Sequence, residues 1–106
     1  MTTPEASLEF NEAGRARLSG AVDFDTVPPL YQRMLDSEHR DTEVDLSGLE
    51  RADSAALALL LEWQSRLKAK GATLTVRHAP SHLRQLADLC EASALLGLER
   101  TGGEQT

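Results

Sequence analysis

The sequence predicts an α/β domain in which three or four helices lie mainly on one face of a mixed four- to five-stranded sheet. Its 106 residues are enough for one hydrophobic core and too few for two. Segments in which apolar and polar residues alternate, as in strands, are followed by segments whose apolar residues recur every three or four positions, as in helices. The resulting order, β-β-α-β-α-β-α, favours parallel strand pairs joined by helical crossovers. We expect a single domain over residues 1–106, with an ordered core at about 7–99 and short polar tails.

Local signals along the chain set the expected elements. Strands are expected at residues 8–10, 15–22, 43–46 and 72–79, and helices at residues 26–39, 53–70 and 81–93. Gly14 suits a positive φ in the first hairpin turn, and Gly71 occupies the usual position after a helix end. Thr26 and Asp53 are the expected N-caps of the first and second helices. The segment LLGLER, residues 95–100, is expected to close the fold as a short strand or a turn of helix.

The charge balance excludes some partners. Acidic residues outnumber basic ones by 17 to 11, which gives a net charge of -6. No basic surplus is available to neutralise nucleic acid or an anionic membrane surface. The N-terminal segment MTTPEASLEF lacks a signal-peptide pattern, and no stretch approaches the ~20 apolar residues of a membrane span. We therefore expect a cytoplasmic protein that binds no nucleic acid and does not insert directly into a membrane.

Cysteine and histidine usage gives no sign of a metal or redox site. The single cysteine, Cys90, excludes an internal disulfide. It follows apolar residues at helical spacing, Leu83, Leu86 and Ala87, so we expect it to behave as a small buried hydrophobe. The three histidines, His39, His78 and His82, do not have the spacing of metal ligands. No metal and no cofactor are therefore expected.

An enzyme is the alternative from a different class. A hydrolase could be built from Ser54, Asp53 and one of the three histidines, but it would require a serine on a sharp turn between glycines, as in G-x-S-x-G. The segment ADSAA has neither glycine, and an Asp next to the serine in sequence is a cap rather than a triad partner. No Gly-rich phosphate loop is present either. We expect no catalytic residues.

Asp53 and Ser54 stand at the head of the apolar middle helix. Asp53 is well suited to accept backbone N–H bonds there, and its charge complements the helix dipole. Ser54 would project its hydroxyl at the same end, where free N–H groups favour an anion, including a phosphate on Ser54 itself. The pair is therefore either simply the cap of the helix or also a docking or switching site.

The middle helix is apolar over more than one stripe. Its ordinary core face consists of residues at i, i+3 and i+4 spacing: Leu57, Leu60, Leu61 and Leu67. Leu59 and Trp63 lie one turn apart and well round the helix from that face. Either neighbouring elements cover them, or they form a partner surface anchored by Trp63, because aromatic side chains are enriched at interface centres. Tyr31 and Met34, on the preceding helix, are secondary candidates for the same surface.

The segment VDLSGLERADSAALALLLEW, residues 44–63, resembles the central motif of STAS domains, a family of bacterial anti-sigma-factor antagonists and transporter-associated modules. In that family a strand with an acidic end leads through a short loop to Asp-Ser or Asp-Thr and then to an apolar helix. The earlier segment LSGAVDFDTVPPLYQRM is similar to the family's second strand and first helix. The resemblance runs over residues 8–98, and the predicted order of elements agrees with a STAS-like fold.

Within the family the resemblance is strongest to the cytoplasmic subunit of a Gram-negative ABC transporter that moves phospholipids between the two membranes. It implies a non-enzymatic module that docks on the transporter's ATPase subunit and lies at the inner membrane through that partner. Ser54 matches the Ser/Thr that the family presents for phosphorylation or partner contact, and Asp53 matches its acidic neighbour. The expected partner-binding residues are Asp53, Ser54, Ala56, Leu59, Trp63, Tyr31 and Met34.

One position departs from the family pattern. Ala56 stands where the family often has glycine, and its methyl group restricts close approach of a partner backbone or a kinase. This weakens phosphorylation more than docking, so Ser54 is treated first as a contact residue. The alternative function is an anti-sigma-factor antagonist regulated by phosphorylation of Ser54.

Overall fold

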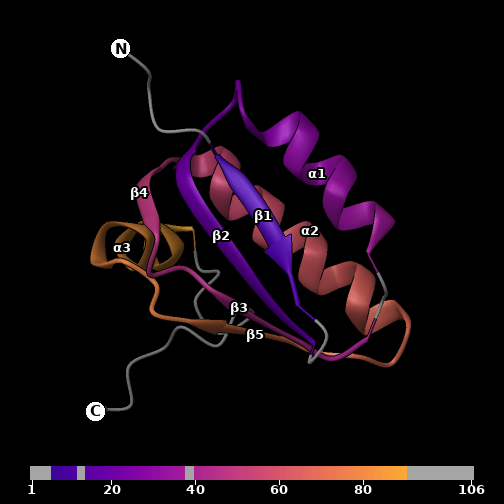
Figure 1. Cartoon of the computed structure of the whole chain (residues 1–106). Coiled ribbons are helices and arrows are strands. Elements are labelled where there is room, and N and C mark those ends of the chain that lie inside the picture. Colours follow the sequence, from indigo (N-terminus) through magenta and orange to yellow (C-terminus); the bar gives the residue numbers. More distant parts are fainter. Residues whose placement is uncertain (1–5, 12–13, 38–39, 91–106) are drawn as a thin grey trace.

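The computed structural model describes residues 6–11, 14–37 and 40–90, which form one five-stranded sheet and three helices (Figure 1). In chain order the elements are β1 (Ser7–Phe10), β2 (Arg15–Val22), α1 (Val27–Asp36), β3 (Thr42–Asp45), β4 (Leu49–Ala52), α2 (Ser54–Ala69), β5 (Leu74–Arg77) and α3 (Ser81–Leu89). The pair β1–β2 is antiparallel, and the other pairs are parallel. The predicted STAS-like α/β fold with a mixed sheet is confirmed.

The long strand β2 organises the sheet. Its first half, Arg15–Arg17, pairs with β3, and its second half, Gly20–Val22, pairs with β4, with a register shift between Gly20 and Ala21. The strand β4 was not among the predicted elements. Its sequence, LERA, places the exposed residues Glu50 and Arg51 next to each other, so no alternation signals a strand. The strand β4 therefore forms because it pairs with β2, and its own sequence has no hydrophobic pattern that would predict it.

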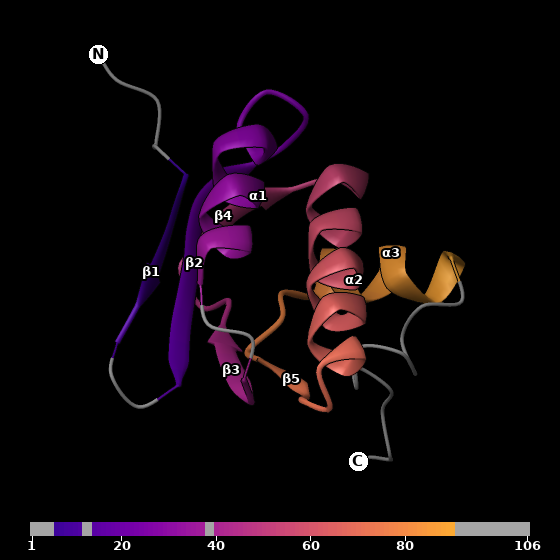
Figure 2. The same cartoon turned by 90° about the vertical axis from the view of Figure 1, so that its right-hand side faces the viewer.

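The helices cover one face of the sheet. Figure 2 shows α1 and α2 on the same side of the strands, with α3 beyond α2. The helix α2 contacts α1, α3, β4 and β5, so it lies at the centre of the helical layer. The largest fully buried side chains come from all layers: Leu8, Leu18, Val22, Met34, Val44, Leu46, Leu60, Trp63, Leu67 and Leu83. The opposite face of the sheet carries charged side chains, among them Arg15 and Arg17, which are exposed.

Three predictions about turns and caps are confirmed, and a fourth needs a correction. Gly14 and Gly71 have φ of 75° and 77°, as expected for a hairpin turn and a helix end. Asp53 caps α2 with its side chain. Thr26 stands at the N-cap position of α1, but its side chain makes no capping bond. Its hydroxyl instead donates to the carbonyl oxygen of Ala21, at 2.9 Å.

The prediction that Cys90 is buried is wrong. The helix α3 ends at Leu89, and Cys90 follows it as an exposed free thiol. The apolar positions before it are as predicted, because Leu83 and Ala87 are buried and Leu86 is half-buried. The segment LLGLER lies outside the described residues. Within the part of the chain that is described, no helix is long and apolar enough to span a membrane.

Candidate partner-binding site

Two loops meet at the carboxyl ends of β2 and β4. Val22 and Ala52, the last residues of these strands, are register partners in the sheet. The backbone N–H of Asp53 donates to the carbonyl oxygen of Val22 at 3.4 Å, and Arg51 Nη2 lies 3.7 Å from Asp23 Oδ2. Figure 2 shows the β2–α1 connection and the start of α2 at the same end of the molecule. Residues that follow β2 and β4 therefore share one surface.

The head of α2 is fixed by Asp53. Its Oδ1 accepts the N–H of Ala55 at 2.8 Å, and its carbonyl oxygen accepts the N–H of Ala56 at 3.0 Å and of Leu57 at 3.3 Å. The backbone of Asp53 is extended, as an N-cap requires. Ser54 is the first helical residue and is exposed. The capping role of Asp53 is confirmed, and the Ser54 side chain is presented to solvent at the positive end of the helix dipole.

The neighbouring turn, residues 23–26, is held by its own side chains. Asp23 Oδ1 accepts the N–H of Asp25 at 3.0 Å and of Thr26 at 3.1 Å. The Thr26 hydroxyl accepts the N–H of Asp23 at 2.9 Å. On this turn Phe24 is 78% exposed. Phe24 was not among the predicted site residues, although a large apolar residue between two aspartates in a predicted loop is a signal for one.

Four predicted partner-binding residues lie in the core. Ala56, Leu59, Trp63 and Met34 are each exposed by 2% or less. Of the two possibilities for Leu59 and Trp63, coverage by neighbouring elements is the one that the structure shows, because α1, α3, β4 and β5 all contact α2. The wide stripe therefore belongs to a helix at the centre of its layer. In this conformation a partner has no access to these four side chains.

Tyr31 is half-buried and belongs to a separate polar cluster. Its hydroxyl accepts from Arg66 Nη2 at 2.9 Å and lies 3.5 Å from Glu62 Oε2, and Arg66 Nε lies 2.8 Å from the same carboxylate oxygen. The hydrogen bond with Tyr31 raises the pKa of Arg66. Glu62 lies eight residues after Ser54, about 12 Å further along α2. The structure therefore does not bring Tyr31 to the head of the helix.

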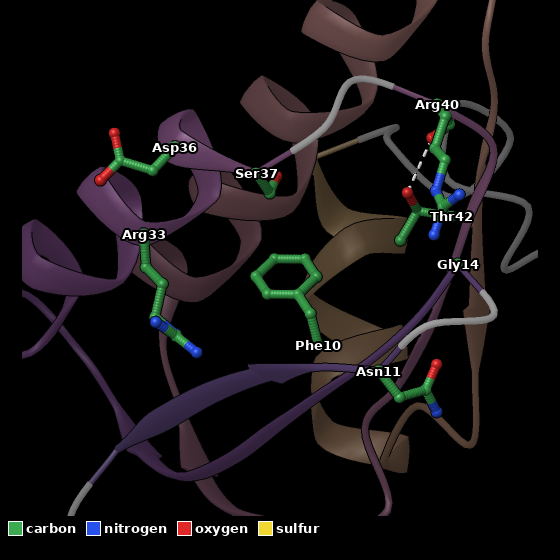
Figure 3. Close-up of a pocket in the computed structure, with 8 residues that line it drawn as sticks. All are labelled: Phe10, Asn11, Gly14, Arg33, Asp36, Ser37, Arg40 and Thr42. Carbon is green, nitrogen blue, oxygen red and sulfur yellow. Dashed lines mark hydrogen bonds between the residues drawn. The ribbon is translucent and has the colours of Figure 1, made fainter.

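A cavity of about 310 Å³ lies at the opposite end of α1 (Figure 3). Its lining includes Phe10, Arg33, Asp36, Arg40 and Thr42. The Arg33 guanidinium donates to the carbonyl oxygen of Leu8 and lies 5.8 Å from the centre of the Phe10 ring. Arg33 therefore anchors β1 to α1. Ser37, also in the lining, donates its hydroxyl to the carbonyl oxygen of Met34 at 2.6 Å.

Two of the three histidines lie in the described part of the chain, and one of them contacts a carboxylate. No group of three or more His, Cys, Asp or Glu among residues 6–11, 14–37 and 40–90 could hold a metal ion. His78 Nδ1 lies 3.0 Å from Asp45 Oδ1 at the carboxyl ends of β3 and β5. The Ser47 N–H donates to Asp45 and, with His78, lowers the pKa of that carboxyl. His82 is exposed on α3, and His39 lies outside the described residues.

The family model described as "Mlab, STAS domain" matches residues 9–97. The chain belongs to the STAS domain family. It is 32% identical over 84 residues to the intermembrane phospholipid transport system binding protein MlaB of Escherichia coli (strain K12), with 78% of this chain and 87% of that protein covered. The MlaB of Shigella flexneri matches with the same identity and coverage.

Solved structures agree on the STAS fold. One chain of the Acinetobacter MlaFEDB complex in an ATP-bound conformation superposes with a TM-score of 0.72 at 24% identity, covering 88% of this chain and 99% of that one. A crystal structure of Mglu gives a TM-score of 0.54 at 23% identity, covering 70% of this chain and 19% of that one. At these identities the likeness establishes the fold.

Proposed function

We propose that this chain is a non-enzymatic STAS subunit that docks on the ATPase subunit of an ABC transporter moving phospholipids between the inner and outer membranes. The observation that carries the proposal is the head of α2, where Asp53 is fixed as the cap and Ser54 is exposed beside it. The relatives at 32% identity are named as binding proteins of an intermembrane phospholipid transport system. A similar chain occurs in the Acinetobacter MlaFEDB complex.

The proposed role of the pair is contact, with no chemistry performed by this chain. Asp53 holds the helix end in one geometry, and Ser54 offers a hydroxyl beside free N–H groups that favour a partner's acceptor. ATP binding and hydrolysis belong to the partner. Docking on that partner places the chain at the cytoplasmic face of the inner membrane without any insertion of its own.

The alternative, an anti-sigma-factor antagonist switched by phosphorylation of Ser54, has one favourable feature and one unfavourable feature. A phosphate at an exposed helix N-terminus is electrostatically favourable. However, the relatives named above belong to a lipid transport system. The transporter function is therefore the conclusion.

The test is purification of the tagged chain from its native host in mild detergent. The proposal predicts that the ATPase and membrane subunits of one ABC transporter elute with it in fixed ratio. The same purification with Ser54→Glu provides a matched control, because its fold is expected to survive while the transporter subunits are lost. Recovery of a serine kinase or a sigma-factor regulator in place of transporter subunits would contradict the proposal.

A further inference from the structure

We propose that Phe24 is the apolar anchor of the docking surface and that the ATPase subunit receives it in an apolar socket bordered by Lys or Arg. This inference rests on the proposed function and adds the chemistry of the partner's side. It combines three properties of the turn that follows β2: an exposed aromatic ring, a backbone held in place before binding, and a border of carboxylates.

The exposure of Phe24 has no explanation within the fold. Its side chain is 78% exposed, whereas Phe10, the other phenylalanine, is 36% exposed and packs against Trp63. Pro28 and Pro29, in the first turn of α1, are also exposed. Aromatic side chains bury a large area and are typical anchors at the centres of interfaces.

Hydrogen bonds within the chain hold the turn that carries Phe24. Asp23 accepts two backbone N–H groups of the turn through one carboxylate oxygen. The Thr26 hydroxyl joins the turn to β2 by accepting from Asp23 and donating to Ala21, each at 2.9 Å. A side chain on such a backbone loses less conformational freedom on binding than one on a flexible loop. The turn therefore presents Phe24 at low entropic cost.

Phe24 and Ser54 belong to one surface. Each lies two residues beyond a strand end, and those ends, Val22 and Ala52, are paired. The ion pair between Arg51 and Asp23 connects the two loops a second time. A partner that contacts the Ser54 hydroxyl therefore meets the edge of the Phe24 turn as well.

The charges around Phe24 select the class of partner. Asp23, Asp25 and Asp53 lie on the two loops, and Arg51 is ion-paired with the first of them. A second copy of this chain would bring the same carboxylates face to face across a two-fold axis, which is unfavourable. An anionic lipid surface is repelled for the same reason. A basic border on a protein partner complements this surface, and its attraction to the carboxylates weakens as salt rises.

The experiment is calorimetric titration of the intact chain with the purified ATPase subunit. Phe24→Ala is expected to raise Kd about thirtyfold or more without changing the melting midpoint. Leu89→Ala is the matched control, because Leu89 is 83% exposed on a different element, and its Kd should stay within about twofold of wild type. Asp25→Asn should slow association, whereas Asp36→Asn, at the far end of α1, should not.

The possible results separate a failure of the proposed function from a failure of the proposed role of Phe24. If the wild-type chain does not bind the ATPase subunit, the proposed function fails and this inference with it. If the wild type binds and Phe24→Ala binds equally well, only this inference fails. A wild-type dimer that Phe24→Ala dissociates in sedimentation would assign the surface to a second copy of the chain. Binding to anionic vesicles that Phe24→Ala abolishes would assign it to lipid, and either result overturns the inference.

Discussion

The Trp63 ring meets the Phe10 ring nearly edge to face, with centroids 5.9 Å apart and an interplanar angle of 68°. This contact joins the end of β1 to the centre of α2. Trp63 is 1% exposed, and its Nε1 is the buried side-chain polar atom that lacks a hydrogen-bond partner among the described residues. Trp63 therefore stabilises the core by apolar packing, while its unsatisfied N–H donor opposes part of that stabilisation.

Truncation of Trp63 should weaken the fold. Trp63→Ala is expected to lower the free energy of unfolding by about 3–5 kcal/mol, because it leaves a large cavity in the core. Trp63→Phe should cost less, since it also removes the unsatisfied N–H. Urea unfolding followed by circular dichroism measures both. If the free energy of unfolding of Trp63→Ala is within about 1 kcal/mol of the wild-type value, Trp63 is not a core residue.

Removal of the cap should have a smaller effect. Asp53→Ala deletes the 2.8 Å bond from the Ala55 N–H, and the free energy of unfolding should fall by about 0.5–2 kcal/mol. Asp53→Asn keeps an acceptor oxygen at the same place and should lose only a few tenths of a kcal/mol. The same urea experiment compares the two variants. Equal losses for both would show that the bond at the cap is not the cause.

The carboxyl of Asp45 predicts a specific acid dependence. The backbone bond from Ser47, together with His78, holds its pKa below the ordinary value of 3.8. Because the pKa is lowered on folding, its stabilisation is present above pH 3.8 and is lost as pH falls through the folded value. Asp45→Asn should therefore be less stable than wild type at pH 7, and the difference should shrink as pH falls below 3.8. Unfolding curves of both proteins at pH 7 and below pH 3.8 measure this difference in stability. A difference that does not change with pH would contradict the lowered pKa of Asp45.

The fold was predictable where one local signal sufficed. Asp53 before an apolar run and Gly71 after it bounded α2 correctly, because caps and helix stops are local chemistry. The strand β4 was missed because Glu50 and Arg51 carry no pattern and the strand depends on pairing with β2. The prediction that Cys90 is buried was also wrong, because helical spacing indicates which face a residue is on but not the residue at which the helix ends.

The candidate site was predictable in part. Asp53 and Ser54 are identified by the helix start and by the family motif. For Trp63 the sequence leaves both a buried and a surface position open, because an apolar stripe does not reveal how many neighbours cover it, and only the packing of α2 between α1 and α3 decides that. The one sequence signal for Phe24 is its position between two aspartates in a predicted loop, which does not give its exposure. Its exposure follows from the turn that Asp23 and Thr26 build, which is a tertiary property.

The most direct test of the docking account is the effect of Ser54→Glu on binding to the ATPase subunit, measured beside a melting curve of the same protein. The fold should survive, because a carboxylate near a helix N-terminus is favourable by roughly 0.3–1 kcal/mol. Binding should be lost, because a second negative charge beside Asp53 would have to be buried against the partner. Ser65→Glu, on an exposed position further along α2, is the matched control and should bind like wild type. A stable Ser54→Glu protein that binds like wild type would contradict the account and leave Asp53 and Ser54 as the helix start alone.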